Sequence, residues 1–172
     1  AEATEMGPLC THGQLETIER EVAGAVAEGA TLVCGGKRAE VGEMFFEPTV
    51  LDCPSPDLSI VDTELFGPVL CVLRFKTEAE ALRLANDTEH GLAAGIFTRD
   101  NARALRMSRA VRAGIVWVNT YRVVSPIAEF GGIKGSGYGR ESGFQAMYDY
   151  TRPKTVWMNT SDEPMANPFV MR

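Results

Sequence analysis

Residues that bind metal ions are scarce in this sequence. Its 172 residues include four cysteines and two histidines, and no two cysteines form a CxxC pair. The histidines, His12 and His90, are too far apart in the chain to complete a zinc-ligand motif. We therefore expect no metal site, and cysteines without a pairing pattern favour a reduced, cytoplasmic protein.

Long runs of one charge sign or of apolar residues are also missing. The net charge is −6, and acidic and basic residues are interspersed along the chain. Nucleic-acid-binding proteins carry a basic stripe, which this chain lacks. No stretch of about 18 uncharged apolar residues occurs, and the first residues lack the basic and apolar regions of a signal peptide. We expect no nucleic-acid partner and no membrane partner.

The glycine-rich segment Phe130–Gly143, FGGIKGSGYGRESG, fits neither common phosphate-binding pattern. It contains no GxxxxGK followed by Ser or Thr, and the run from Gly135 fails GxGxxG because Arg140 stands at the sixth position. A dinucleotide fingerprint also follows its strand directly, whereas this segment lies further along the chain. A nucleotide-binding domain built on this loop is therefore the least favoured interpretation.

The composition favours one folded core. Hydrophobic residues make up 45% of the chain and charged residues 23%, as in ordinary globular domains. From Thr11 onward, apolar residues recur at spacings of three and four, which predicts a helix that ends at Gly29. The segment FFEPTVLDC begins at Phe45, and Pro48 within it predicts an edge or loop-like strand.

Three later apolar runs alternate with two helical segments. The predicted strands are Val69–Phe75, Leu92–Phe97 and Gly114–Asn119. Thr77 begins a capping-box pattern for a helix through about Asn86, and Asp100 is the expected N-cap of a helix over Ala102–Val111. Strands that are apolar on both faces and separated by helices predict an α/β fold, with an open parallel sheet and crossover helices.

A long irregular stretch follows Asn119 and extends to about Gly143. It leaves the carboxyl end of a strand, where open parallel sheets place their ligands, so we expect it to be functional. A short helix at Phe144–Asp149 and a strand-like run at Lys154–Met158 complete the chain. We divide the chain into a domain over residues 1–150 and a tail over residues 151–172.

Four segments resemble aldehyde dehydrogenase sequences, in the order and at the spacing of that family. They are ELFGPV (Glu64–Val69), HGLAAGIFTRD (His90–Asp100), GIVWVN (Gly114–Asn119) and FGGIKGSGYGRESG (Phe130–Gly143). GPL (Gly7–Leu9) and EPTVL (Glu47–Leu51) extend the resemblance over nearly the whole chain. The resemblance implies the carboxy-terminal portion of the family's catalytic domain.

The resemblance also implies a reaction that this chain does not complete alone. Family members oxidise an aldehyde to a carboxylic acid with NAD or NADP, through a thiohemiacetal on a cysteine. No residue here matches the nucleophilic cysteine, the general-base glutamate or the cofactor domain, so we expect an inactive fragment of an active parent. A non-catalytic binding or assembly module with the same fold is the alternative.

Three residues match family positions near the cofactor and the proton relay. Glu64 corresponds to the glutamate that holds the nicotinamide-side ribose, where a carboxylate accepts hydrogen bonds from sugar hydroxyls. Phe66 corresponds to the aromatic residue that packs beside the nicotinamide. Glu141 corresponds to a buried glutamate that the family uses in a proton relay through water.

The remaining matches concern the substrate and the oligomer. Asn119 ends the strand that leads into the substrate loop, Tyr121 begins the segment expected to line the tunnel, and Phe130 matches the aromatic residue at the tunnel mouth. Lys154–Met158 resembles the strand that joins the sheet of a partner subunit, which implies a homo-oligomer.

Overall fold

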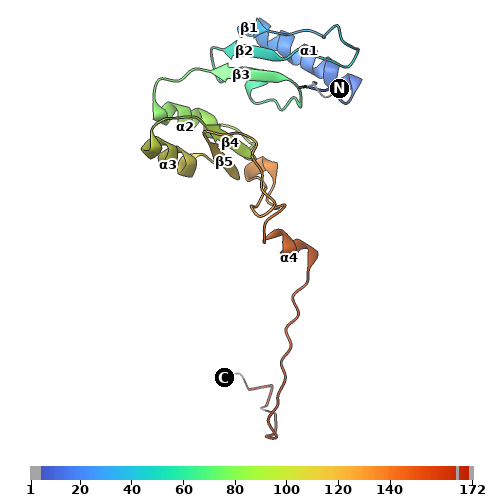
Figure 1. The fold of residues 1–172 in the computed structure, drawn as a ribbon, viewed down its shortest axis with the longest axis vertical. Helices are drawn as coiled ribbons and strands as arrows, with labels where there is room; N and C mark the ends of the chain where they lie inside the picture. Colours follow the sequence, from blue (N-terminus) through green and yellow to red (C-terminus); the bar gives the residue numbers. More distant parts are fainter. Residues whose placement is uncertain (1–4, 166, 171–172) are drawn as a thin grey trace.

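The computed structural model describes residues 5–165 and 167–170 and consists of two lobes followed by an extended tail (Figure 1). The elements are α1 (His12–Ala27), β1 (Thr31–Cys34), β2 (Thr49–Cys53), η1 (Ser59–Val61), β3 (Val69–Leu73), α2 (Glu78–Asn86), β4 (Ala93–Ile96), α3 (Asn101–Ala110), β5 (Ile115–Val118), η2 (Lys134–Ser136) and α4 (Ala146–Tyr150). The first lobe contains α1 and β1 to β3, and the second contains α2 to β5.

Helix α1 forms where the apolar spacing predicts it. The Thr11 side chain accepts a hydrogen bond from the third residue of the helix, and Gly29, at φ 109°, turns the chain after the last turn. The stripe of Leu15, Ile18 and Val22 is buried against the sheet. This packing forms the hydrophobic core of the first lobe.

Strand β2 is the central strand of the first sheet, so the prediction of an edge or loop-like strand is wrong. It pairs antiparallel with β1 and parallel with β3. Pro48 lies immediately before Thr49, the first residue of β2, so its missing N–H removes no hydrogen bond from the ladder. The inward side chains of Thr49, Leu51 and Cys53 are all buried.

The second lobe contains the expected helix between two parallel strands. Strands β4 and β5 pair in parallel, and α3 connects them. Thr77 and Asp100 cap α2 and α3, as predicted, by accepting hydrogen bonds from the backbone N–H groups of Glu80 at 3.1 Å and Arg103 at 3.0 Å.

The prediction of a single parallel sheet is wrong. Among the described residues the strands form two sheets, β1-β2-β3 and β4-β5, and β1 runs antiparallel to β2. The predicted strand Val69–Phe75 shortens to β3 and pairs with the earlier β2 rather than with the later strands. The apolar pattern of a strand indicates which of its faces are buried, but it does not predict which other strand it pairs with.

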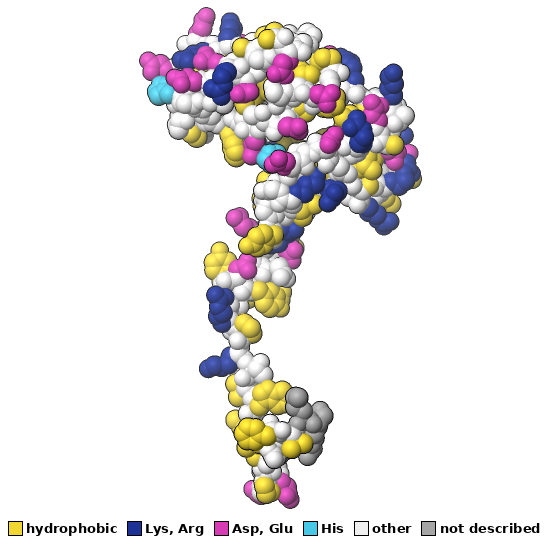
Figure 2. Space-filling view, turned by 180° about the vertical axis from the view of Figure 1, so that it is seen from behind, with side chains coloured by type: hydrophobic (Ala, Val, Ile, Leu, Met, Phe, Trp, Pro, Cys, Tyr) yellow, Lys and Arg dark blue, Asp and Glu magenta, His cyan; other side chains and the backbone are white. Residues whose placement is uncertain are grey.

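The tail extends away from both lobes (Figure 1). Its short helix is shifted to Ala146–Tyr150 from the predicted Phe144–Asp149. Lys154–Met158 is exposed and forms no strand within this chain, and Trp157 is 93% exposed. Figure 2 shows hydrophobic side chains uncovered along this tail. Residues 166, 171 and 172 of the predicted 151–172 tail lie outside the described residues.

None of the helices in the described part of the chain combines the length and the apolar character required to cross a membrane.

Glycine is required where β5 meets the glycine-rich loop, and we expect Gly114→Ala to be destabilising. A Cβ atom at Gly114 would overlap the carbonyl oxygen of Gly131, a backbone atom that cannot rotate away. We expect a loss of about 1–3 kcal/mol in the free energy of unfolding, measured by urea denaturation. Gly24→Ala, in the open middle of α1, should instead stabilise by about 0.5–1 kcal/mol. Equal effects of the two substitutions would contradict this account.

Candidate functional site

The loop between η1 and β3 holds two of the predicted site residues on its outer side. Leu65 packs against the core of the first lobe, while its neighbours Glu64 and Phe66 are exposed. The Phe66 side chain is 77% exposed, and its backbone lies in the left-handed region at φ 48°. This conformation costs a non-glycine residue about 1–2 kcal/mol, so the surrounding contacts must hold it.

Helix α1 supplies those contacts. The Gln14 side-chain amide donates hydrogen bonds to the backbone carbonyl of Leu65 at 3.3 Å and to that of Phe66. Gly67 lies directly against the Ile18 side chain, leaving no room for a Cβ atom. The loop is therefore fixed to α1 at consecutive residues. Gln14 could not be recognised from the sequence, because a polar residue in the first turn of a helix carries no signal of a distant backbone partner.

Glu64 and Phe66 are the two residues for which the resemblance implies contacts to a nicotinamide cofactor. Within the described residues, no hydrogen bond or ion pair engages the Glu64 carboxylate. It is thus able to accept hydrogen bonds from a diol such as a ribose. The Phe66 ring, two residues further along the chain, is also exposed and offers an apolar face.

Asn119 joins the ends of the two strands in the second lobe. Its backbone lies at φ 54°, directly after β5. Its side-chain oxygen accepts a hydrogen bond from the Thr98 N–H at 2.9 Å, and its side-chain nitrogen donates to the Thr98 carbonyl at 2.9 Å. The amide therefore fixes the point at which the chain leaves β5 and enters the predicted substrate loop.

Tyr121 lies at the start of that loop and is 61% exposed. Its ring meets Trp117 of β5 edge to face, with centroids 5.4 Å apart. The Trp117 indole N–H also donates to the Val123 carbonyl at 2.8 Å. Trp117 of β5 therefore contacts the loop at two of its first residues, Tyr121 and Val123.

Phe130 and Glu141 are brought together by their backbones. Each N–H donates to the carbonyl of the other at 2.7 Å, and both residues line an open hollow of about 480 Å³. Glu141 is exposed, which differs from the buried position expected from the resemblance. The bridge to Phe130 uses backbone atoms, so the Glu141 side chain takes no part in it.

Two cations stabilise the glycine-rich loop by binding carbonyl groups. Arg140 donates to the Gly132 carbonyl at 2.7 Å, and Lys134 donates to the Asn86 and Thr88 carbonyls at 3.0 and 3.1 Å. These two roles are not evident from the sequence, because both depend on carbonyl groups of other residues that only the fold brings close. Both side chains are engaged in holding the backbone, so neither is directed to an anion.

The structure places the predicted residues in two groups. Glu64 and Phe66 belong to the first lobe, whereas Asn119, Tyr121, Phe130 and Glu141 belong to the second lobe and its loop. The hollow beside Phe130 includes neither Glu64 nor Phe66. In residues 5–165 and 167–170, no three His, Cys, Asp or Glu side chains are grouped as metal ligands.

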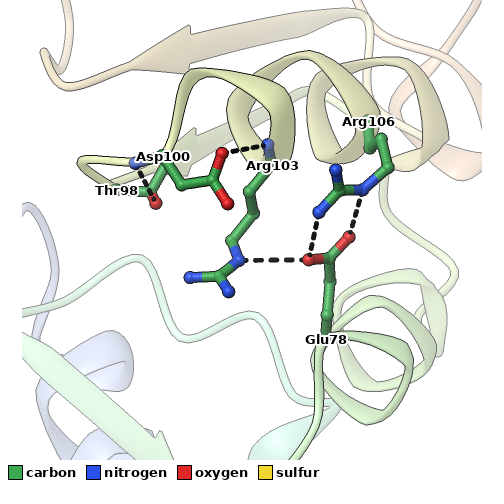
Figure 3. Close-up of polar contacts among 5 residues, drawn as sticks. All are labelled: Glu78, Thr98, Asp100, Arg103 and Arg106. Carbon is green, nitrogen blue, oxygen red and sulfur yellow. Dashed lines mark hydrogen bonds and ion pairs between the residues drawn. The ribbon is translucent and has the colours of Figure 1, made fainter.

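An ion-pair cluster joins α2 to α3 in the second lobe (Figure 3). The Glu78 carboxylate accepts hydrogen bonds from Arg103 at 3.0 Å and from two nitrogens of Arg106 at 3.0 and 2.9 Å. The hydrogen bonds from Arg106, followed by the one from Arg103, lower the pKa of Glu78 from 4.5 to about 2. Glu78 therefore stays ionised throughout the neutral and mildly acidic range.

The comparisons with known proteins identify the family. The aldehyde dehydrogenase family model matches residues 1–156. A dehydrogenase of (Z)-2-((N-methylformamido)methylene)-5-hydroxybutyrolactone from Acinetobacter baylyi is 54% identical, covering 98% of this chain and 35% of that protein. Betaine aldehyde dehydrogenase from Brucella anthropi is 43% identical, covering 95% of this chain and 35% of the relative. This chain belongs to the aldehyde dehydrogenase family.

Solved structures agree with this family and its α/β fold. An apo betaine aldehyde dehydrogenase variant from Staphylococcus aureus is similar with a TM-score of 0.88 and 38% identity, covering 99% of this chain and 35% of that one. An NAD+ complex of an aldehyde dehydrogenase from Bacillus cereus has a TM-score of 0.88 and 40% identity, covering 94% and 33%. The chain spans about a third of the length of the relatives it matches.

The Glu78 cluster gives an expected pH dependence of stability. Its folded-state pKa of about 2 lies below the ordinary 4.5, so its contribution is present above pH 4.5 and is lost as the pH falls towards 2. We expect Glu78→Gln to lower the urea midpoint at neutral pH, and the difference from the unmodified chain to shrink as the pH falls below about 4.5. Glu43→Gln, at an exposed position, is the control. A difference that is constant with pH would refute the prediction.

Proposed function

We propose that this chain is the carboxy-terminal portion of the catalytic domain of an aldehyde dehydrogenase. The parent enzyme oxidises an aldehyde to a carboxylic acid with NAD or NADP, through a thiohemiacetal on a cysteine outside the 172 residues. The observation that carries the proposal is the anchored loop that presents Glu64 and Phe66, in a chain that belongs to this family. The chain alone is expected to be inactive.

Glu64 and Phe66 are the proposed cofactor contacts. The Glu64 carboxylate would accept hydrogen bonds from the hydroxyls of the nicotinamide-side ribose, and the Phe66 ring would pack beside the nicotinamide. When bound, the cofactor supplies the acceptor for the hydride that leaves the substrate. The chain's own contribution is to hold these two side chains in a fixed orientation.

The second lobe supplies the proposed substrate wall. Asn119 fixes the start of the loop, Tyr121 and Phe130 provide aromatic surface for the tunnel, and Glu141 lies beside Phe130. We propose Glu141 as the proton-relay carboxylate of the parent. Its exposure in this chain is compatible with that role, because a relay through water requires contact with solvent-filled space.

Exposed apolar surface supports the proposal that this chain is part of a larger enzyme. An open hollow of about 550 Å³ between α2, α3 and β4 is lined in part by Phe75 and Phe97, which are 60% and 71% exposed. Contiguous apolar surface of this kind is ordinarily covered in a finished domain. We propose that the cofactor domain and the rest of the catalytic domain cover it, in a cytoplasmic enzyme.

We also propose that residues 1–150 and 151–172 have separate tasks. The first range forms part of the catalytic domain, and Lys154–Met158 in the second joins the sheet of another subunit in a homo-oligomer. The support is the exposure of Val156, Trp157 and Met158, at 71%, 93% and 79%, in an extended segment. Such a segment gains both ladder hydrogen bonds and apolar burial when it adds to a sheet edge.

The proposed activity is tested by comparing the purified chain with a chimera in which this chain replaces the matching part of a full-length relative. We expect the purified chain to form no NADH or NADPH with betaine aldehyde or a 5-hydroxybutyrolactone, which is a masked aldehyde. The Acinetobacter baylyi relative, with its matching third replaced by this chain, should turn over at least one of these substrates. In that chimera, Glu64→Gln should raise KM for NAD(P) about tenfold or more, because the accepting charge is lost.

Glu40→Gln, at an exposed position outside the site, is the control for the Glu64 variant. An inactive chimera that folds would favour the non-catalytic module. Turnover by the chain alone would mean that a cysteine of this chain is the nucleophile.

The oligomer is tested with a pair of matched tail variants. In the active chimera, we expect Trp157→Asp to shift the assembly to smaller species in analytical ultracentrifugation, because a charge in a joining strand opposes burial. Phe169→Asp makes a similar change at a residue that is equally exposed, at 93%, but outside Lys154–Met158. The same shift from both variants, or from neither, would exclude a specific role for this segment.

A further inference from the structure

The loop Glu64–Gly67 is held in place by one polar side chain that belongs to another element. Gln14 lies in the first turn of α1, 51 residues from Leu65 in the sequence. Its side-chain nitrogen donates to the Leu65 carbonyl at 3.3 Å and also to the Phe66 carbonyl. A primary amide carries two N–H groups, so both are used to bind this loop.

The two bonded carbonyls explain the unusual backbone of Phe66. Consecutive carbonyls of an extended chain point in opposite directions, and here both reach the same nitrogen. The left-handed φ of 48° at Phe66 accompanies this convergence. An aromatic residue rarely adopts this conformation without compensation. The hydrogen bonds from Gln14 meet the backbone carbonyls on both sides of this strained φ angle.

The apolar contacts on either side do not replace the amide. Leu65 packs into the core and Gly67 lies against Ile18, which hold the loop near α1. Neither contact sets the rotation of the peptide planes around Phe66. That rotation decides where the Phe66 ring points relative to Glu64.

We infer that Gln14 is a positioning residue for the cofactor contacts, acting through the backbone carbonyls of Leu65 and Phe66. The inference rests on the proposed function, because its consequence is expressed at Glu64 and Phe66. Gln14 holds the exposed carboxylate and ring in one relative orientation before the cofactor arrives. Preorganisation of this kind lowers the ordering cost of binding.

The test uses Gln14→Glu, which keeps the shape of the side chain and removes both donors. A carboxylate facing two carbonyl oxygens repels them, so the loop should be released. In the active chimera we expect KM for NAD(P) to rise about tenfold, while KM for the aldehyde changes less than twofold. Gln145→Glu, at the chain's other glutamine, makes the same chemical change at an exposed position and should leave both constants unchanged.

A second measurement on the chain itself separates positioning from general damage. The Val69 N–H donates to the Gly67 carbonyl at 2.9 Å, and the Thr63 N–H donates to the Ile60 carbonyl at 3.3 Å. We expect Gln14→Glu to speed hydrogen exchange at these two amides, with the amides of β2 unchanged. Gln14→Asn, which keeps the donors on a shorter side chain, should restore part of the cofactor affinity.

The outcomes distinguish the two proposals. If the chimera with the unmodified chain is inactive, the proposed function fails and this inference fails with it. If that chimera is active and Gln14→Glu leaves KM for NAD(P) unchanged, the inference alone is overturned. Equal losses in both KM values together with faster exchange throughout the first lobe would also overturn it, because Gln14 would then serve only general stability.

Discussion

The packing of α1 on the first sheet is the interaction on which the candidate site depends. Leu15, Ile18 and Leu51 are fully buried at this interface, and each such side chain contributes about 1.5–3 kcal/mol relative to exposure. The same helix carries Gln14 beside this apolar stripe. Burial of this stripe fixes the position of α1 on the sheet, and with it the distance and direction from which Gln14 reaches the loop. The backbone conformation at Phe66 therefore depends on the packing of the hydrophobic core.

The second lobe is organised differently. Within the described residues, Val111 is its buried hydrophobic side chain, whereas polar contacts to backbone groups are numerous. Asn119, Lys134 and Arg140 each hold a carbonyl of a neighbouring segment. Such bonds fix the course of a loop with precision but bury little apolar surface. This explains how an ordered loop after β5 coexists with exposed aromatic residues such as Tyr121 and Phe97.

Local structure could be predicted from the sequence to a large extent. The caps at Thr77 and Asp100 and the helices that follow them were correct, because capping depends on residues within one turn. The prediction that β2 is an edge strand was wrong, because Pro48 lies one residue before the strand rather than within it. The single parallel sheet was wrong because strand partners are chosen by long-range packing, which periodicity does not encode.

The sequence by itself determined the elements, their caps and the family motifs, since these depend on residue type and short spacing. It placed Glu64 and Phe66 near one another because they are two residues apart. Only the tertiary structure decided that both side chains face outward and that Gln14 holds their loop. It also decided that Glu141 is exposed at its bridge to Phe130. The physical reason is that hydrogen bonds between distant segments form only after burial of the core has brought those segments together.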